Sequence, residues 1–441
     1  MTTFWCEHAM LPGGVRRSVR VVVDRGRILD VLPEVPAEPG DVRLGGVVLP
    51  GLANGHSHAF HRALRGRTHD DGGNFWTWRD AMYTVTHRLD PERYHALAKA
   101  VFAEMVLAGY TVVGEFHYVH HAAGGRRYDD PNAMGKALIS AAREAGIRIT
   151  LLDTCYLAGG LFVSGHLPLD EVQQRFSDGT VEAWAERVEL LSDDETVRIG
   201  AAVHSVRAVP RDDLAAVAEF GARDERPLHV HLSEQPGENL ACEGFYGCSP
   251  TELLAGAGLL TPTTTVVHAT HLSDSDIELL GDARATACFC PTTERDLADG
   301  IGPARRLHDA GAPLALGSDQ HAVIDPFEEA RGVEMHERLE SLERGRFTGA
   351  ELLGMATRNG YRALGWGDGG VIAGGRLADL VAVRLDSPRT AGCAPDQVLY
   401  AATSADVSDV VVAGQHVVRD GRHRAGDVGL LLTDAIAAVR K

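Results

Sequence analysis

The stretch Leu49-Pro50-Gly51-Leu52-Ala53-Asn54-Gly55-His56-Ser57-His58 carries the strongest indication of how this chain folds. An apolar run over residues 46–52 passes a Pro-Gly break and leads into a His-x-His pair. Side chains two apart on a strand point to the same side, so we expect the rings of His56 and His58 to face one way. Two imidazoles at the end of a strand form half of a tetrahedral metal site. The pair alone is weak evidence of a metal, because two exposed histidines have the same spacing.

Seven further short apolar segments follow this one, and longer segments with a helical pattern separate them. Eight buried strands that alternate with helices predict an α/β fold, specifically a (β/α)8 TIM-like barrel. Several of the segments are apolar throughout, which is typical of parallel strands covered on both faces. The predicted strands are residues 46–52, 112–117, 147–153, 197–204, 227–232, 264–268, 286–290 and 313–317.

Both ends of the chain have the pattern of short β-strands. Residues 19–23 and 26–32 lie near the start, and residues 378–383 and 410–421 lie near the end, the last with the Gly-containing turn of a hairpin. We therefore expect a small β-sandwich domain built from residues 1–48 plus 370–430. The barrel then covers residues 49–369, and residues 431–441 form a C-terminal helix or tail.

Composition limits the class of protein. The 441 residues suffice for a large barrel plus a smaller module, and the formal net charge of -18 argues against nucleic acid as a partner. No apolar run approaches the roughly 20 residues that span a bilayer, so we expect no membrane contact. The N-terminus lacks the pattern of a signal peptide, and the seven cysteines are scattered with no Cys-x-x-Cys pair. These features predict a cytoplasmic protein with free thiols.

Histidines and carboxylates gather after six of the eight predicted strands, at the end where barrel active sites lie. A single histidine at a strand end usually only bonds a backbone carbonyl, but six such ends together predict a metal site. The residues concerned are His56 and His58; the run 115–121; His204 and Arg207; His229, His231 and Glu234; His268 and His271; and Ser318, Asp319, Gln320 and His321.

With these segments in place, the chain resembles the amidohydrolase superfamily over essentially its whole length. The His-x-His pair, His231 followed by Glu234, and Ser318-Asp319 are similar to the mononuclear deaminase branch. The resemblance implies a barrel joined to a β-sandwich from both chain ends. Because relatives in the superfamily often form dimers, it also implies a homodimer. It implies that one metal is held by His56, His58, His231 and Asp319, and that Glu234, His268 and Asp319 are the catalytic residues.

Lysine usage bears on the number of metals. Binuclear members of the superfamily commonly bridge their metals with a carboxylated lysine on the fourth strand, and this chain has no lysine between Lys136 and Lys441. One divalent metal per chain is therefore the better interpretation. Three histidines and one aspartate suit Zn²⁺, with iron and manganese as alternatives by ligand type.

These residues predict hydrolytic deamination. A bound metal lowers the pKa of water to near neutrality and so supplies hydroxide. Asp319 would accept the proton of the water, Glu234 would reach the substrate nitrogen as acid or base, and His268 would polarise the water or stabilise the tetrahedral intermediate.

A second set of residues indicates an anionic small-molecule substrate. The segment Phe75-Trp76-Thr77-Trp78-Arg79 follows the first ligands, and we interpret it as a loop over the site. Arg79 and Arg207, with Tyr118 and His204, form a cradle suited to carboxylates. Because the chain is negatively charged overall, such arginines are needed to reverse the sign of the charge inside the cleft.

This second set also resembles the branch of the superfamily that hydrolyses N-formimino-L-glutamate to N-formyl-L-glutamate and ammonia in bacterial histidine breakdown. The matching segments are residues 54–60, 75–79, 115–121, 204–209 and 299–302. The resemblance implies substrate contacts from His61, Arg79, Tyr118, His204 and Arg207. Two positions depart from it: His61 stands where some relatives carry Gln, and Gln320 stands where Ser is familiar.

Two alternatives remain at this point. One is a deaminase of guanine-like or other heterocyclic substrates, and the other is a metal-free relative that acts as a binding or scaffold protein. Intact His56, His58, His231, Glu234, His268 and Asp319 argue against the second alternative. The unrelated zinc nucleobase deaminases need a Pro-Cys-x-x-Cys signature, which this sequence lacks.

Overall fold

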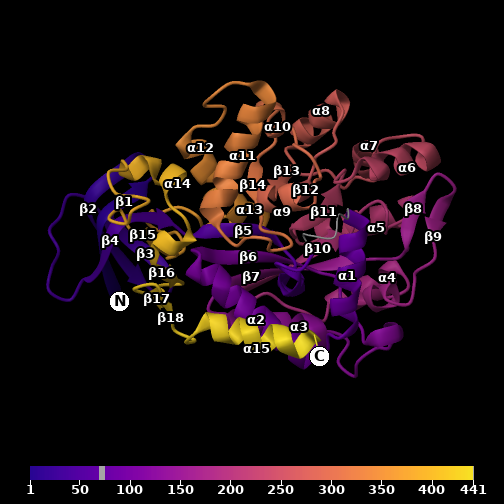
Figure 1. Ribbon diagram of the computed structural model, residues 1–441, viewed down its shortest axis with the longest axis horizontal. Coiled ribbons are helices and arrows are strands. Elements are labelled where there is room, and N and C mark those ends of the chain that lie inside the picture. Colours follow the sequence, from indigo (N-terminus) through magenta and orange to yellow (C-terminus); the bar gives the residue numbers. More distant parts are fainter. Residues whose placement is uncertain (69–74, 441) are drawn as a thin grey trace.

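Eight parallel strands form a nearly closed barrel in the computed structural model, which describes residues 1–68 and 75–440. Figure 1 shows the barrel on the right, with helices around it and a second sheet to its left. An isolated parallel bridge between Ser57 and Asp319 links the first and last strands. In barrel order the strands are β5 (Leu52–Ser57), β6 (Tyr110–His117), β7 (Arg148–Cys155), β10 (Val197–Val203), β11 (Leu228–Leu232), β12 (Thr264–His268), β13 (Thr286–Phe289) and β14 (Leu314–Leu316).

Helices cover the outside of the barrel. Several begin where the sequence supplies a cap: Asp90 accepts a hydrogen bond from the Arg93 backbone, and Ser273 forms a capping box with Asp276. The helices are α1 (Phe75–His87), α2 (Pro91–Leu107), α3 (Ala133–Ala145), α4 (Val181–Val188), α5 (Arg211–Ala222), α6 (Pro236–Tyr246), α7 (Pro250–Gly256), α8 (Asp274–Ala283), α9 (Pro291–Asp296), α10 (Ala304–Asp309), α11 (Pro326–Ser341), α12 (Gly349–Gly354), α13 (Gly360–Ala363), α14 (Val398–Ala401) and α15 (Val428–Arg440).

Short helical turns and one small hairpin complete the chain between these elements. The hairpin of β8 (Gly160–Phe162) and β9 (Gly165–Leu167) packs beside α6. The turns are η1 (Ala59–Leu64), η2 (Ala123–Gly125), η3 (Gln173–Phe176), η4 (Met355–Asn359), η5 (Pro395–Gln397) and η6 (Ser404–Asp406).

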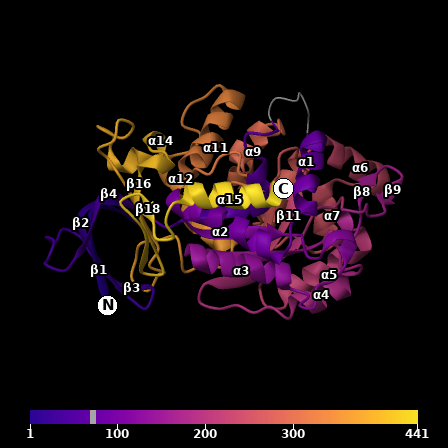
Figure 2. The ribbon, with the colours of Figure 1, turned by 60° about the horizontal axis from the view of Figure 1, so that its bottom comes forward.

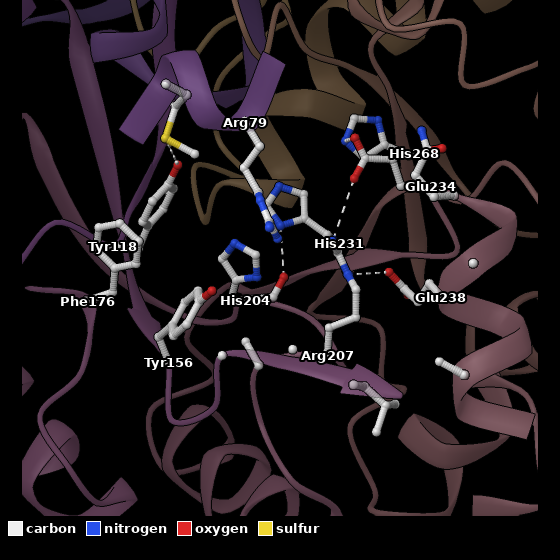
Figure 3. A pocket seen from close by; sticks show the side chains of 18 of the residues that line it. Arg79, Tyr118, Tyr156, Phe176, His204, Arg207, His231, Glu234, Glu238 and His268 are labelled. Carbon is white, nitrogen blue, oxygen red and sulfur yellow. Dashed lines mark hydrogen bonds and ion pairs between the residues drawn. The ribbon is translucent and has the colours of Figure 1, made fainter. Parts of the chain in front are cut away.

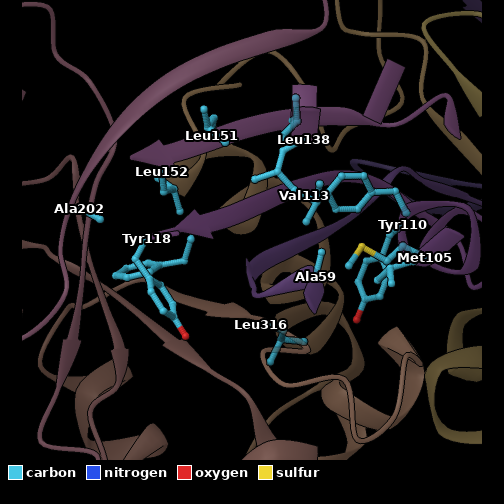
Figure 4. Close-up of a cluster of buried hydrophobic side chains, with 14 of the residues drawn as sticks. Ala59, Met105, Tyr110, Val113, Tyr118, Leu138, Leu151, Leu152, Ala202 and Leu316 are labelled. Atoms are coloured by element: carbon cyan, nitrogen blue, oxygen red, sulfur yellow. The ribbon is translucent and has the colours of Figure 1, made fainter. Parts of the chain in front are cut away.

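The core lies between the barrel strands and the helices that cover them. Figure 4 shows Leu138 of α3 beside Leu151 and Val113 of the neighbouring strands β7 and β6. All three side chains are buried. This burial on the outer face, together with a filled interior, explains why the strands are apolar throughout, as expected for a parallel sheet.

The two ends of the chain form one mixed sheet of eight strands. Its order is β18-β17-β16-β15-β4-β1-β2-β3, with every pair antiparallel except β1 with β4. Figure 2 shows the N-terminal strands beside the C-terminal ones at one side of the molecule. The strands are β1 (Thr2–Leu11), β2 (Gly14–Asp24), β3 (Arg27–Leu32), β4 (Val42–Pro50), β15 (Leu380–Val383), β16 (Val407–Val412), β17 (Gln415–Arg419) and β18 (Arg422–His423).

This sheet folds over a core of its own. A bridge between Arg27 and Leu377 joins its two halves, and Val21 shares a buried cluster with Leu380. The predicted hairpin near residue 414 is confirmed, since Ala413 and Gly414 turn with φ of 51° and 73° between β16 and β17. A barrel with a β unit from both chain ends is therefore confirmed, and the unit is one continuous folded sheet. The boundaries at residues 48, 370 and 430 stay predictions.

The first predicted barrel strand, residues 46–52, is wrong in its placement. Pro50 ends β4 and pairs with Leu380 in the terminal sheet, whereas Leu52 begins β5 in the barrel. Gly51 makes the passage between the sheets, where a Cβ would lie 2.4 Å from the Thr111 hydroxyl oxygen. Both sheets bury this segment, so a continuous apolar run cannot reveal where one sheet ends.

The C-terminal helix α15 lies along α2 on the outside of the barrel, as Figure 1 shows. His423, just before it, contacts the backbone carbonyl of Ala145 at the end of α3, 2.9 Å away. Among the helices of residues 1–68 and 75–440, none is both long and apolar enough to cross a membrane.

Gly317 provides a test of how tightly the barrel closes. A Cβ at this position would lie 2.8 Å from the Cβ of His56 and 2.9 Å from its carbonyl oxygen. Gly317→Ala should therefore destabilise the protein by about 1–3 kcal/mol through overpacking. Chemical denaturation, together with analysis of bound metal, measures the effect.

Gly256→Ala is the matched control, because no atom lies within 4 Å of a Cβ there. An unchanged unfolding midpoint in Gly317→Ala would contradict the close packing of the seam.

Candidate active site

Four buried side chains converge at the mouth of the barrel. His56 and His58 come from the end of β5, His231 from β11, and Asp319 from just after β14. The Nε2 atoms of His56 and His58 lie 3.1 Å and 3.4 Å from Nε2 of His231. One oxygen of Asp319, Oδ1, lies 3.4 Å from Nε2 of both His56 and His58. The structure thus brings together the four residues predicted as metal ligands.

The hydrogen bonds behind these rings favour a cation between them. Nδ1 of His58 lies 3.0 Å from the Phe116 carbonyl oxygen, and Nδ1 of His231 lies 2.8 Å from the His204 carbonyl oxygen. A carbonyl only accepts, so each Nδ1 carries the proton and each Nε2 presents a lone pair. Burial lowers the pKa of His56 to about 3 and that of His58 to about 4, which keeps both rings neutral. Convergent lone pairs beside a carboxylate suit a divalent metal ion.

The backbone at this end of the barrel is strained. His268 has a φ of 69° and Asp319 a φ of 39°, values that non-glycine residues rarely adopt. His268 is the last residue of β12 and Asp319 lies three residues beyond the end of β14, where the chain turns and directs both side chains into the mouth. Such conformations persist only where surrounding contacts hold them, and they are common at active sites.

Next to the histidine cluster lies a chain of charged side chains centred on His268. Its Nε2 lies 3.7 Å from Glu234 and 3.9 Å from Asp319, and its Nδ1 lies 3.5 Å from Glu294. Burial alone would lower the pKa of His268, but these three carboxylates outweigh it and raise the pKa well above its usual value. Burial raises the pKa of Glu234. The geometry thus places a cationic imidazole between carboxylates, one of which holds its proton more tightly than usual.

The same mouth opens into a cavity of about 650 Å³. Figure 3 shows Arg79 reaching into it from helix α1 and Arg207 from the opposite side, with His204 and His231 between them. All five residues predicted to contact substrate line this cavity: His61, Arg79, Tyr118, His204 and Arg207.

The segment 75–79 is not the loop that the sequence indicated. It begins helix α1, and Trp78, Arg79, Met82 and Tyr83 of this helix line the cavity. These four positions follow a helical period, so one face of the helix covers the site. The aromatic and threonine residues of the segment gave no strong helix signal, because their intrinsic helix propensity is modest.

Arg207 is held in place by carboxylates. Its Nε lies 2.8 Å from Glu238, and its Nη2 lies 3.6 Å from Glu234. Glu238 also accepts a hydrogen bond of 2.9 Å from the Ser233 backbone, which ties the arginine to the end of β11. Because a guanidinium has five N–H groups in a fork, Arg207 can bind these carboxylates and still present donors to a ligand.

Tyr118 and His61 form the wall next to the histidine cluster. The Tyr118 hydroxyl lies 3.1 Å from Nε2 of His61 and 3.7 Å from the sulfur of Met82. Burial raises the pKa of Tyr118 well above its usual value, so its hydroxyl stays neutral. The ring of His204 packs edge-on against Tyr118, with centroids 5.5 Å apart.

Three histidines of the run 115–121 point away from the site. His117, His120 and His121 lie in a separate buried network with Asp153 and Asp178 that is centred on Arg187, which binds both aspartates. The guanidinium already neutralises Asp153, so this network holds the loop after β6 and does not suit a metal.

Four more of the predicted polar positions bind elsewhere. His229 contacts the Ala363 carbonyl, His271 the Asp299 carbonyl, and His321 the hydroxyls of Ser57 and Ser318. The amide of Gln320 donates to Asp296.

The sequence analysis missed several residues of the site. Glu238 and Glu294 lie on helices that follow barrel strands, and Tyr156 follows β7, a strand for which no polar end was proposed. Glu238 had a detectable signal, because it lies one helical turn after Glu234. Tyr83 had none, since it reaches the cavity only through the packing of α1.

Known proteins resemble this chain in sequence and in fold. Residues 47–417 match the amidohydrolase family. The chain is 37% identical to formimidoylglutamate deiminase of Pseudomonas aeruginosa over 96% of each chain, and 31% identical to 8-oxoguanine deaminase of the same species over 96% and 95%. A crystal structure of an amidohydrolase from Brucella melitensis superposes with a TM-score of 0.92 and 32% identity, covering 100% of both chains.

The fold and the site define a hydrolase built on a barrel. The chain belongs to the amidohydrolase family, whose members bind a divalent metal, and it is a hydrolase that acts on carbon–nitrogen bonds.

Removal of one histidine should remove the metal. His231→Asn takes away one of three convergent nitrogen ligands, so we expect metal affinity to fall by more than about 100-fold. Metal analysis after dialysis measures the metal content, which should drop from about one equivalent per chain to a small fraction.

His229→Asn serves as the control, because His229 lies on the same strand but contacts the Ala363 carbonyl. Equal metal content in both variants would contradict the role of His231 as a ligand.

Proposed function

We propose that the protein hydrolyses N-formimino-L-glutamate to N-formyl-L-glutamate and ammonia. One observation carries the proposal: the cavity that holds the His/Asp cluster also holds two arginines, Arg79 and Arg207, on opposite walls. The substrate has an amidine carbon for hydrolysis and two carboxylates that match two cationic groups. The 37% identity to a formimidoylglutamate deiminase supports the same substrate.

In this proposal one divalent ion, Zn²⁺ by the chemistry of its ligands, is held by His56, His58, His231 and Asp319. When bound, such an ion supplies water whose pKa is lowered to near neutrality. A second grouping that could hold a metal joins His268 to His56 and Asp319. We assign His268 to the attacking water instead, because it lies between the carboxylates of Glu234 and Glu294 and is therefore protonated.

Two side chains then move protons, and a third stabilises the attacking water. Asp319 is ionised, because a hydrogen bond with His56 and the positive charge of His268 outweigh burial and hold its pKa well below the usual range. It accepts a proton from the attacking water. His268 donates a hydrogen bond to the oxygen of the water, which gains negative charge as Asp319 takes its proton. Glu234, whose pKa is raised by burial, delivers a proton to the imino nitrogen as water adds. When the C–N bond breaks, the proton held by Asp319 passes to the same nitrogen, so that ammonia leaves, and the hydroxyl proton of the tetrahedral intermediate returns to Glu234 as the carbonyl forms.

The arginines, with Tyr118, His204 and His61, orient the substrate. Burial lowers the pKa of His204 well below its usual value, so at neutral pH the ring is uncharged and accepts or donates hydrogen bonds. The positive charge that binds the carboxylates therefore comes from the guanidinium groups. A place in histidine breakdown, a cytoplasmic location and a homodimer belong to the same proposal.

The first test is ammonia release by metal-analysed protein. We expect rapid release from N-formimino-L-glutamate at about one metal per chain, and slower release from N-formimino-L-aspartate, whose shorter side chain cannot span the same groups. The competing assignment is a purine deaminase, which the 31% identity to an 8-oxoguanine deaminase supports. Guanine and 8-oxoguanine are therefore assayed alongside. Turnover of these purines, with none of the formimino compound, would overturn the proposal.

Removal of Arg207 tests the cradle. Arg207→Ala should lower kcat/KM for N-formimino-L-glutamate by roughly 10- to 100-fold, because a charge-assisted contact to a carboxylate is lost. Bound metal should stay at the wild-type level, since the guanidinium pairs with Glu238 and Glu234, which are not among the four residues proposed to hold the metal.

Arg211→Ala is the matched control, because this arginine lies outside the cavity and stacks on Tyr246. Wild-type kinetics in Arg207→Ala would remove it from the cradle.

A further inference from the structure

A hydrogen-bonded group of three residues, Gln173, Tyr83 and Tyr156, stands behind the arginines of the cavity. Nε2 of the Gln173 amide lies 3.1 Å from both tyrosine hydroxyls and 2.9 Å from the Gly159 carbonyl oxygen. Both tyrosines line the cavity, and Gln173 is buried behind them. None of the three belongs to the residues assigned above to metal, catalysis or the cradle.

The orientation of the amide is determined by its neighbours. Oε1 of Gln173 accepts a hydrogen bond of 2.9 Å from the Asp170 backbone, and the Asp170 carboxylate accepts one of 2.8 Å from the Gln173 backbone. A backbone N–H only donates, so the oxygen faces Asp170 and the NH2 group faces the tyrosines. The amide therefore acts as a donor toward the cavity wall.

This group has one more hydrogen-bond donor than it can use among its own acceptors. The NH2 group has two hydrogens, and the Gly159 carbonyl takes one of them. The other hydrogen and the two hydroxyl hydrogens face two hydroxyl oxygens. If each oxygen accepts one hydrogen bond within the group, one hydroxyl hydrogen is left for an acceptor outside the group. The cavity lies on that side.

The surroundings select a negatively charged acceptor. The Arg79 guanidinium lies 5.4 Å from the centroid of the Tyr83 ring, and Arg207 lines the same cavity. Burial raises the pKa of Tyr156 well above its usual value, so its hydroxyl is a neutral donor at neutral pH. A surplus donor beside two cations is matched by a carboxylate or another anion.

Packing fixes the direction of the Tyr156 hydroxyl. Its ring lies edge-on against His204, with centroids 4.6 Å apart, and against Phe176, with centroids 5.3 Å apart. Figure 3 shows the hydroxyl directed toward the middle of the pocket, on the same side as His204. The ring cannot swing away without loss of both contacts, so the hydroxyl is preorganised for a ligand.

We propose that Tyr156, held by Gln173, donates a hydrogen bond to a carboxylate of the substrate and so helps to select a dicarboxylate. This inference rests on the proposed function, since it names a further group that reads the same substrate. Tyr156 is a specificity residue, and Gln173 is a positioning residue that acts through it.

The variant Tyr156→Phe removes the hydroxyl and keeps the packed ring. The zinc-loaded full-length protein is assayed with N-formimino-L-glutamate, and calorimetry measures binding of the product N-formyl-L-glutamate. We expect KM and the product Kd to rise roughly 10- to 100-fold, as for a lost hydrogen bond to a charged group. We expect kcat to change less than about threefold, because the contact is the same in ground state and transition state.

Tyr400→Phe is the matched control, since its hydroxyl donates to the Phe347 carbonyl outside the cavity. KM and Kd of Tyr156→Phe within twofold of wild type would overturn the proposal, as would a fall in kcat alone. If the wild-type enzyme releases no ammonia from N-formimino-L-glutamate, the proposed function fails. The calorimetric comparison of the two tyrosine variants still decides whether Tyr156 binds the dicarboxylate.

A double-mutant cycle tests the part played by Gln173. If Gln173 acts by orienting the Tyr156 hydroxyl, Gln173→Met raises KM, and the double variant Gln173→Met/Tyr156→Phe binds no more weakly than Tyr156→Phe alone. Additive losses would assign Gln173 a separate effect and overturn its positioning role.

Discussion

The contact between the first and last barrel strands is the constraint on which the rest of the site depends. The carbonyl of His56 accepts hydrogen bonds of 3.2 Å and 3.0 Å from the backbones of Ser318 and Asp319, and the backbone of His58 donates to the Asp319 carbonyl at 3.1 Å. Backbone pairing therefore decides which side chains meet, before any metal is considered. Because side chains alternate along a strand, a shift by one residue would turn Asp319 away from both histidines. Gly317 permits this register, since only hydrogen fits against His56.

Charge balance joins the metal cluster to the substrate cavity. Ion pairs run from Glu238 through Arg207 and Glu234 to His268, which also faces Glu294 and Asp319. In this group two organic cations, Arg207 and His268, face four carboxyl groups. With Glu234 protonated, as its role as the acid requires, three of the four are charged, so one negative charge is left in a buried place. Buried charge without compensation is costly, and a divalent ion beside Asp319 supplies the balance. The electrostatics thus favour a metal for a reason separate from the geometry of the histidine rings.

The sequence predicted the barrel and the residues at its strand ends because both depend on local pattern. Buried parallel strands are apolar runs, and His56, His58, His231 and Asp319 each lie at the end of such a run or within a few residues of it. Local pattern did not predict features that are set by packing between segments far apart in the sequence. Phe116 faces His56 inside the mouth, with ring centroids 5.1 Å apart, so its neighbour His117 points outward to its own network. The division of the apolar run at Gly51 is set by the two sheets that bury the segment on either side. The helical form of residues 75–79 is set by packing over the cavity. Local sequence determines neither.

Arg207 shows why recognition and chemistry are parts of one electrostatic unit. It contacts Glu238, which fixes it, and Glu234, which we assign to proton delivery. When a substrate carboxylate binds Arg207, the positive charge of Arg207 is divided between that carboxylate and Glu234. The ionised form of Glu234 is then stabilised less, so the pKa of Glu234 rises further as the substrate binds. Glu234 therefore carries a proton for the leaving nitrogen when the anionic substrate is bound. A neutral heterocycle would add no charged partner for Arg79 and Arg207 beyond the contacts that they already make, whereas a dicarboxylate would add two. The charges of this cavity therefore favour a dicarboxylate over a purine.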